Sequence, residues 1–462
     1  MTLTGLASAV RERRVSSREL VRMSLERIER SNPVLNAVIA LRAEEALAEA
    51  EALDARVAAS EDLGPLAGIP LLVKDNEDCA GLPTTFGSLL RADALPAEAD
   101  CEAVARLRAA GAIVVGKTNV PEFAFEGFTS NRLFGDTRNP WSLAWSPGGS
   151  SGGSGAAIVA GLAPIATGTD GGGSVRIPAA FCGLVGLKPT NGLIGQWPTP
   201  SWIELSTKGP LATSVADARL LLDVLRGPIA GAPTAAPMWE PSPDARVSRI
   251  LATPRLVVHD EPLSPELLAS FEAALRRLEA ATDLPVEPID PLYPAELDDD
   301  WNTLAGVDEL TWLGRDVVEA RKGELTDYLR SALGHAGRIS IDEYLAARRR
   351  RFVFCRSTDE LLGEDAILVC PTMCVEGFPA DGRLPGADAA GSDSIHYNTQ
   401  PANSTGHPAL SVPAGVSSNG VPFGLQITGP RFRDDLVLNV GAAWERANPW
   451  PLVAPGHEPF EV

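Results

Sequence analysis

The sequence predicts an α/β fold, because the patterns of short buried strands alternate with those of helices. Residues 66–74 (LAGIPLLVK) form the apolar run of a buried strand, residues 102–110 have a helical pattern, and residues 112–115 again resemble a strand. Strand patterns return at residues 366–371 and 409–428. Such alternation is typical of helices packed on a sheet. We therefore expect one α/β core that is built from two separated parts of the chain.

This core divides the 462 residues into four parts. Residues 1–60 are predicted to be an N-terminal helical segment that packs on the core. Residues 61–230 form the first part of the core and residues 366–462 the second. Residues 231–365 have a mostly helical pattern, and we expect them to lie over the core.

Composition and charge exclude several classes of protein. About 45% of the residues are hydrophobic and 22% are charged, as in a globular protein with a full core. The net charge of −20 argues against nucleic-acid binding, which needs a basic surface. No apolar run reaches the roughly 18–20 residues of a membrane-spanning helix, and the first residues lack the pattern of a secretory signal. We expect a cytoplasmic protein with no membrane or nucleic-acid partner.

Cysteine and histidine spacing predicts no metal site. The six cysteines are spread along the chain, which favours free thiols over a disulfide framework. Cys370 and Cys374 have the spacing CxxxC, but no second Cys or His pair follows at zinc-site distance. The five histidines form no HxxxH pair.

Residues 146–174 are rich in Gly and Ser, yet their pattern does not favour a flexible linker. A helix-like apolar stretch at 155–161 and a strand-like stretch at 164–167 interrupt the glycine runs. Glycine here is expected to permit tight turns and close approach of the backbone.

Residues 111–118 match the phosphate-binding pattern GxxxxGK[ST] only formally. The four middle residues are Ala-Ile-Val-Val, which belong to the strand itself, and Val120-Pro121 follow at once. A phosphate-binding loop needs a polar, glycine-rich turn between a strand and a helix. We therefore do not predict a nucleotide site.

Two patterns place a serine nucleophile in the Gly/Ser-rich segment. The first is the GxSxG elbow of Gly148, Ser150 and Gly152, for which His396 or His407 would be the base. The second is a constellation of one lysine and two serines that needs no histidine.

The constellation consists of Lys74 at the end of a buried strand, Ser150 in the string GGSSGGS, and Ser174 after a run of three glycines. A lysine that burial keeps unprotonated can accept a proton from serine. A second serine can relay that proton. The backbone N–H groups of Gly171, Gly172 and Gly173 are candidates for an oxyanion hole.

The residues around this constellation resemble the amidase signature family, which hydrolyses amides with a Ser-Ser-Lys triad. The resemblance covers GIPLLVKD at 68–75 and AGAIVVGKTNVPEFA at 110–124, and it is continuous over 147–190. It resumes at PALSVPAG and GLQITG near the C-terminus. Residues 231–365 do not match, which is expected for the family's variable region, and in the family this region borders the substrate pocket.

The resemblance implies a role for each member of the constellation. Ser174 corresponds to the acylated nucleophile and Lys74 to the base. Ser150, 24 residues before Ser174, corresponds to a bridging serine that follows a cis peptide bond in the family. Gly171 departs from the family, which commonly has a larger residue at this position. Phe125 aligns with a pocket position.

The resemblance also implies the overall architecture and the type of reaction. We expect a single large domain with a mixed, mostly parallel sheet of about eleven strands flanked by helices. It implies hydrolysis through an acyl-enzyme without a metal or organic cofactor, in a monomer or homodimer.

Three substrate classes remain open at this point. A hydrophobic or aryl amide is favoured by aromatic residues in or near segments that should border the site, although core packing is the alternative for each: Phe125, Phe128, Trp197, Trp202, Trp301 and Trp312. A carbamate (urethane) or an ester would suit the same chemistry. The glutamine-hydrolysing branch of the family, a component of the tRNA amidotransferase, is disfavoured. His396 stands where that branch typically has an acidic residue, although Asp393 is close by.

Overall fold

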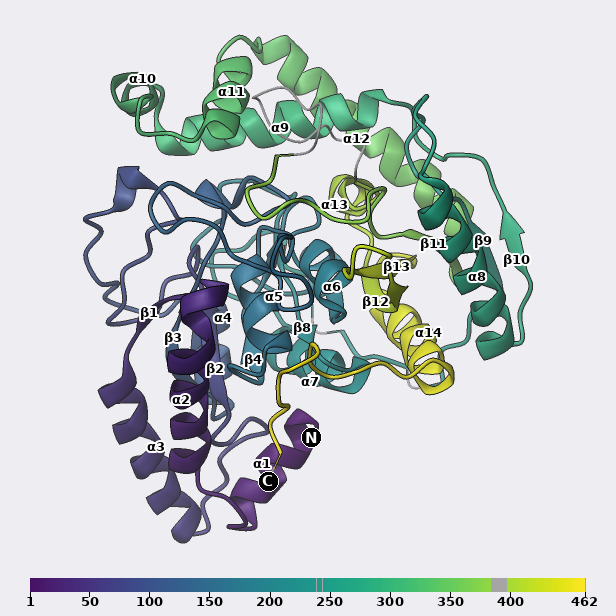
Figure 1. Ribbon diagram of the computed structural model, residues 1–462. Helices are drawn as coiled ribbons and strands as arrows, with labels where there is room; N and C mark the ends of the chain where they lie inside the picture. Colours follow the sequence, from purple (N-terminus) through teal and green to yellow (C-terminus); the bar gives the residue numbers. More distant parts are fainter. Residues whose placement is uncertain (238, 243, 384–396, 462) are drawn as a thin grey trace.

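The computed structural model describes residues 1–237, 239–242, 244–383 and 397–461 of the chain (Figure 1). The helices in this part are α1 (Leu3–Arg11), α2 (Ser17–Leu35), α3 (Ala43–Ala58), α4 (Glu102–Ala109), α5 (Gly152–Val159), α6 (Arg176–Cys182), α7 (Val215–Leu225), α8 (Pro265–Thr282), α9 (Glu296–Leu313), α10 (Arg315–Arg321), α11 (Asp327–Ala336), α12 (Ile341–Leu362), α13 (Gln400–Thr405) and α14 (Asp434–Ala447). The strands are β1 (Val38–Leu41), β2 (Pro70–Lys74), β3 (Ile113–Thr118), β4 (Ile165–Ala166), β5 (Thr169–Asp170), β6 (Val185–Lys188), β7 (Thr207–Lys208), β8 (Leu211–Ala212), β9 (Arg249–Ala252), β10 (Val286–Pro288), β11 (Ala366–Pro371), β12 (Ala409–Val416) and β13 (Pro422–Thr428).

The strands of the described chain form two larger sheets and one small one. The larger sheets have the orders β1-β3-β2-β4 and β10-β9-β11-β13-β12-β6-β8, so the roughly eleven strands expected in one sheet are divided between two, and β5 pairs with β7. The α/β class and the mixed sheet are therefore confirmed.

The expected predominance of parallel pairs is wrong. Within the two larger sheets, β2 pairs in parallel with β3 and β4, and β9 pairs in parallel with β10 and β11. The other pairings, which include β12 with β13 and with β6, are antiparallel. One reason is local: only residues 417–421 connect β12 to β13, and so short a connection permits only an antiparallel hairpin.

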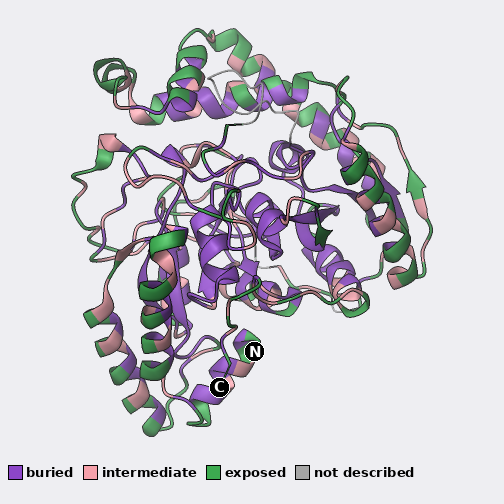
Figure 2. Ribbon diagram, in the orientation of Figure 1, coloured by how far each residue is buried: buried purple, intermediate pink, exposed green. Residues whose placement is uncertain are grey.

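Helices α5 and α6 are at the centre of the molecule and are buried along their whole length (Figure 2). Small residues permit this position, since a Cβ atom added at Gly153 would lie 2.5 Å from the backbone nitrogen of Asn119. The Gly/Ser-rich segment is therefore a packed element of the core, as the interrupted glycine runs predicted, and it is no linker.

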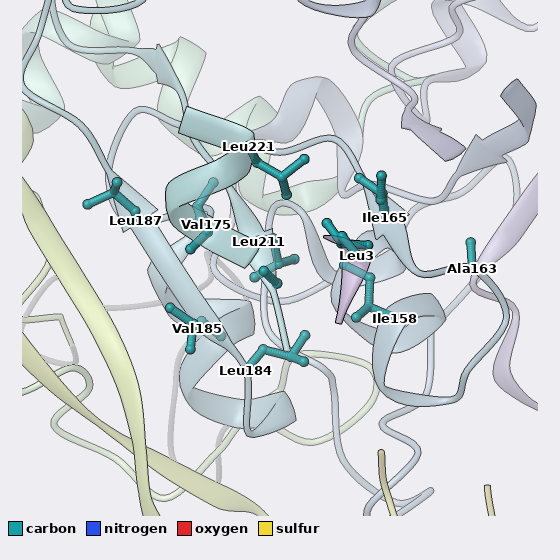
Figure 3. Packing of buried hydrophobic residues seen from close by; sticks show 14 of the residues in the cluster. Leu3, Ile158, Ala163, Ile165, Val175, Leu184, Val185, Leu187, Leu211 and Leu221 are labelled. Carbon is teal, nitrogen blue, oxygen red and sulfur yellow. The ribbon is translucent and has the colours of Figure 1, made fainter. Parts of the chain in front are cut away.

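The N-terminal segment is mainly helical, with α1, α2 and α3, and contains one strand that the sequence pattern did not indicate. Ser16 and Glu19 form the reciprocal capping box at the start of α2. The missed strand, β1, pairs antiparallel with β3 at the edge of the four-stranded sheet. Figure 3 shows Leu3 of α1 among core residues that include Ile158 and Ile165, so this segment packs on the core.

The segment between the two parts of the core is mostly helical, as its pattern predicted. Helices α9, α11 and α12 lie together along one side of the molecule, at the top of Figure 1. The division of the chain into four parts remains an interpretation of the sequence. Among the described residues, no helix combines the length and apolar character that crossing a bilayer requires.

Candidate active site

Lys74 is the last residue of β2, and its amine is in contact with two hydroxyl groups. The side chain of Lys74 is fully buried, and its strand lies between β3 and β4 in the sheet. Lys74 Nζ is 2.8 Å from Ser150 Oγ and 2.7 Å from Thr169 Oγ1. The structure thus brings two of the predicted catalytic residues into direct contact.

Burial makes Lys74 a candidate base. The loss of hydration lowers the pKa of Lys74 to about 7, and Glu77 and Asp170 act against this shift while Lys208 adds to it. About half of the lysine side chains are then unprotonated near neutral pH. An unprotonated amine next to Ser150 Oγ can accept the proton of that hydroxyl.

Ser150 and Ser174 border the same cavity. The peptide bond between Gly149 and Ser150 is cis. Ser174 follows the glycine turn just before α6, and both serines line a cavity of about 330 Å³. Ser174 also lines a second cavity, of about 510 Å³, and therefore lies where the two meet. All three predicted triad residues are at this place.

The glycine turn 171–173 positions backbone N–H groups beside Ser174, with one correction to the prediction. The N–H group of Gly173 donates to Asp170 Oδ1 at 2.8 Å. Gly173 is therefore already paired and is not an oxyanion donor in this conformation. Gly171 and Gly172 line the smaller and the larger cavity, respectively, and stay candidates.

Asp170 and Arg176 anchor this turn by an ion pair and hydrogen bonds. Their side chains are both fully buried and form an ion pair at 2.8 Å. Burial opposes ionisation of Asp170, but Arg176 more than offsets it and lowers the pKa of Asp170 to about 2. Arg176 also donates to the backbone carbonyl of Thr399 at 2.8 Å, which ties the turn to α13. We did not predict these two residues, although Asp170 directly precedes the glycine run.

Two tryptophans pack against the glycine turn. Trp301 of α9 donates its indole N–H to the carbonyl of Gly171 at 3.0 Å. A Cβ atom added at Gly172 would lie 2.5 Å from the Trp301 ring, and one added at Gly171 would lie 2.5 Å from the Trp202 ring. The unusual glycine at position 171 thus leaves the space that Trp202 fills.

The predicted aromatic residues separate into three groups. Phe125 lines the larger cavity and is in edge contact with Trp202, with 5.3 Å between ring centroids. Trp197 and Trp312 line the smaller cavity. Phe128 is buried in a core cluster, where it packs against Tyr328. Core packing, the alternative for each of these residues, thus explains Phe128.

The rejected nucleotide motif is part of the core. Lys117 is in β3 and is fully buried, and its amine donates to the carbonyl of Glu77 at 2.7 Å and lies 3.4 Å from Asp75 Oδ1. A lysine engaged in this way is not available to bind phosphate.

The histidine-based elbow lacks its base in the described chain. The ring of His407 is 2.9 Å from Thr405 Oγ1 and 3.2 Å from Asp359 Oδ1, whereas Ser150 is paired with Lys74. His396 and Asp393 lie outside the described residues.

The six cysteines are free, and the part of the chain that the structure describes holds no candidate metal site. Cys370 and Cys374 are both buried, and burial raises the pKa of the Cys374 thiol to about 12. Over residues 1–237, 239–242, 244–383 and 397–461, no group of three or more His, Cys, Asp or Glu side chains could hold a metal ion.

Comparison with known proteins agrees with this geometry. The family model described as Amidase matches residues 19–438. The chain belongs to the amidase signature family. Among curated relatives, the putative amidase AmiA2 of Mycobacterium tuberculosis is 38% identical over 98% of this chain and 94% of its own length. The acylamidase of Rhodococcus erythropolis is 35% identical over 97% of this chain and 96% of its own.

The relatives also include an amidotransferase component and enzymes of known structure. In a Cyanothece species, one of the glutamyl-tRNA(Gln) amidotransferase chains is 35% identical over 94% of this chain and 95% of its own. The crystal structure of a bacterial aryl acylamidase superimposes with a TM-score of 0.88 at 29% identity, covering 97% of this chain and 96% of that one. The 6-aminohexanoate cyclic dimer hydrolase, complexed with substrate, has a TM-score of 0.88 at 31% identity and covers 99% and 98%. The chain is thus an amidase signature hydrolase that acts on C–N bonds.

Proposed function

We propose that this protein is an amidase that hydrolyses small hydrophobic or aryl amides with the triad Ser174, Ser150 and Lys74. The observation that carries the proposal is the 2.8 Å contact between the buried amine of Lys74 and Ser150 Oγ, beside a cavity that Ser174 also lines. A buried lysine in contact with a serine is the arrangement that a lysine base requires.

The reaction begins when unprotonated Lys74 takes a proton from Ser150, which in turn takes one from Ser174. Ser174 Oγ attacks the carbonyl carbon, and the N–H groups of Gly171 and Gly172 donate to the resulting oxyanion. The C–N bond breaks as the proton returns through Ser150 to the nitrogen, and an acyl ester remains on Ser174. Water then attacks this ester and gives its proton to the relay. The acid is released, and the hydroxyl of Ser174 is restored.

The lining of the two cavities supports a placement of the two halves of the substrate. Ser150 lines only the smaller cavity of the two, and the proton for the departing nitrogen comes through Ser150. The leaving amine therefore occupies the smaller cavity and the acyl group the larger one. Phe125, Trp202, Trp301 and Tyr328 line the larger cavity and supply the aromatic wall that suits a hydrophobic acyl group.

The remaining parts of the proposal follow from the sequence. The reaction needs no metal or organic cofactor, and the partner is the small-molecule substrate rather than a nucleic acid or a membrane. We propose a cytoplasmic location and a monomer or homodimer. The names of the Rhodococcus acylamidase and the bacterial aryl acylamidase support an acyl or aryl amide substrate.

The test compares two matched 4-nitroaniline substrates, an anilide and the corresponding carbamate, with wild type and Ser174→Ala. We expect wild type to prefer the amide, and Ser174→Ala to lose activity by several orders of magnitude. Ser418→Ala, which removes an exposed hydroxyl from the turn between β12 and β13, is the matched control and should retain activity.

Other outcomes select another assignment. Preference for the carbamate would assign a carbamate hydrolase, and turnover of the corresponding 4-nitrophenyl ester alone would assign an esterase. Turnover of glutamine alone would assign the amidotransferase branch. Activity retained by Ser174→Ala would overturn the triad.

A further inference from the structure

A further buried charge pair, Glu77 with Lys208, lies beside the candidate base and is not used in the mechanism. Lys208 Nζ is 2.8 Å from Glu77 Oε1. The side chain of Glu77 is fully buried and that of Lys208 is 16% exposed. Both residues line the smaller cavity, together with Ser150 and Thr169. This pair therefore belongs to the wall nearest the proton relay.

The backbone connects both members of the pair to Lys74. The N–H group of Glu77 donates to the carbonyl of Lys74 at 3.0 Å, so Glu77 follows the base by one tight turn. On the other side, Lys208 of β7 is the direct partner of Thr169 in β5. Thr169 Oγ1 is the hydroxyl that lies 2.7 Å from Lys74 Nζ.

The other charges near Lys74 have buried counter-ions of their own. Asp170 of β5 is paired with Arg176 of α6 at 2.8 Å. Asp75, the residue after the base, lies 3.4 Å from Lys117 of β3. Glu77 is the acidic group whose effect on Lys74 is the strongest, and its counter-ion is Lys208.

The directions of the electrostatic effects agree with this geometry. Burial lowers the pKa of Lys74 to about 7, Glu77 acts to raise it, and Lys208 acts to lower it. Burial acts to lower the pKa of Lys208, but neighbouring acidic groups, Glu77 foremost, more than offset burial and raise this pKa, so Lys208 stays charged. Removal of Lys208 would leave an uncompensated carboxylate next to the base, which favours the protonated lysine.

We propose that Lys208 is a positioning residue for the base, because its 2.8 Å pairing with Glu77 offsets part of the effect of that carboxylate on Lys74 and so favours the unprotonated amine. This inference rests on the proposed triad. It assigns a function to two residues, 131 positions apart, that neither form the triad nor need to touch the reacting atoms.

The experiment measures how fast a fluorophosphonate labels Ser174 as a function of pH, since this reagent needs the activated serine but no particular acyl group. The variants are Lys208→Met, Glu77→Gln and the double variant. We expect Lys208→Met to move the acid limb of the labelling rate to higher pH by about one unit, because a nearby opposite charge shifts a pKa by one to three units. The double variant should return the limb to near its wild-type position, and Lys208→Arg should preserve it.

Lys322→Met is the matched control. It removes the same charge from an exposed ion pair with Glu319 on the surface, and it should leave the acid limb unchanged. The melting temperature of each variant separates electrostatic from structural effects. Since Lys208→Met leaves a buried carboxylate unpaired, it will also lose stability, and the double variant then carries the test.

Three outcomes would contradict the inference. An acid limb that stays in place in Lys208→Met, while only the melting temperature falls, would make the pair purely structural. If the acid limb of the labelling rate stays at higher pH in the double variant, Lys208 does not act by compensating the charge of Glu77. Failure of wild type to be labelled at all, or labelling that persists in Ser174→Ala, would overturn the proposed triad and with it this inference.

Discussion

The two sides of Ser174 are built in different ways. On the base side, Lys74, Ser150 and Thr169 are held by strands and loops between residues 70 and 208, and hydroxyl groups contact the amine directly. On the oxyanion side, the glycine turn is held by side chains from distant parts of the chain, Trp301 in α9 and Thr399 next to α13. The base side is thus specified by residues 70–208, whereas the oxyanion side is completed by side chains that lie 130 and 227 residues away along the chain.

This difference predicts how substitutions on each side affect catalysis. Changes on the base side should abolish proton transfer, whereas changes on the oxyanion side should weaken stabilisation of the transition state by degrees. Four experiments test this comparison.

The largest effect is expected from Lys74→Met, which keeps the length of the side chain but removes the base. Because the members of a triad act as a unit, kcat/KM should fall by about 10⁴-fold or more. Initial rates with a 4-nitroanilide substrate measure the loss, and Lys322→Met should match wild type. A loss below about tenfold would show that Lys74 is not the base.

The next largest effect is expected from Gly172→Ala. The added methyl group would lie 2.5 Å from the Trp301 ring, so the turn or the tryptophan has to move. Loss of one oxyanion donor typically costs about 10²–10³ in kcat. The double variant Gly172→Ala with Trp301→Ala should recover part of this loss, because the obstacle is gone. If kcat does not recover in the double variant, the loss comes from a changed conformation of the turn and not from the clash with Trp301.

The pH profile tests the base side without any mutation. Only unprotonated Lys74 can accept a proton, and burial lowers its pKa to about 7. We therefore expect kcat/KM to fall about tenfold for each pH unit below 7, or about 100-fold at pH 5. Burial also raises the pKa of Glu309 to about 7, so Glu309→Gln is the control and should keep the same acid limb. A flat profile down to pH 4 would contradict the assignment.

The smallest effect is expected from Trp301→Phe, which keeps a ring over the turn but removes the N–H group that donates to Gly171. A positioning hydrogen bond of this kind is worth about 1 kcal/mol, or roughly five- to tenfold in kcat, with KM nearly unchanged. Trp444→Phe removes a similar indole bond, to Pro413, in a part of the core away from the turn. It should lower the melting temperature and leave kcat unchanged. Equal effects of the two variants on kcat would mean that Trp301 acts through stability alone.

Most of the base side could be predicted from the sequence, because its residues lie in continuous motifs. Lys74, Ser150 and Ser174 each stand in a run whose glycines or apolar residues mark the position. The ion pair of Glu77 with Lys208 could not be predicted, since no local pattern relates residues so far apart. It depends on the pairing of β5 with β7, two strands of only two residues each.

The oxyanion side shows the limits of prediction from local sequence. The glycine run marked the turn, but which N–H groups stay available depends on how the turn folds. Gly173 has a φ of +131°, and its N–H donates to Asp170. The hydrogen bond of Trp301 to Gly171 spans 130 residues, so its role required the packing of α9 over the turn. Similarly, the predominance of antiparallel pairs follows from connections such as the β12–β13 hairpin rather than from the apolar runs.

The meeting of two cavities at one hydroxyl has a kinetic consequence. In the proposed reaction, departure of the amine empties the smaller cavity while the acyl group still occupies the larger one. Water and a second amine then compete for the same ester from the same side. The ratio of hydrolysis to acyl transfer should therefore depend on how well the incoming amine fits beside Trp197 and Trp312, so one acyl-enzyme can lead to two products.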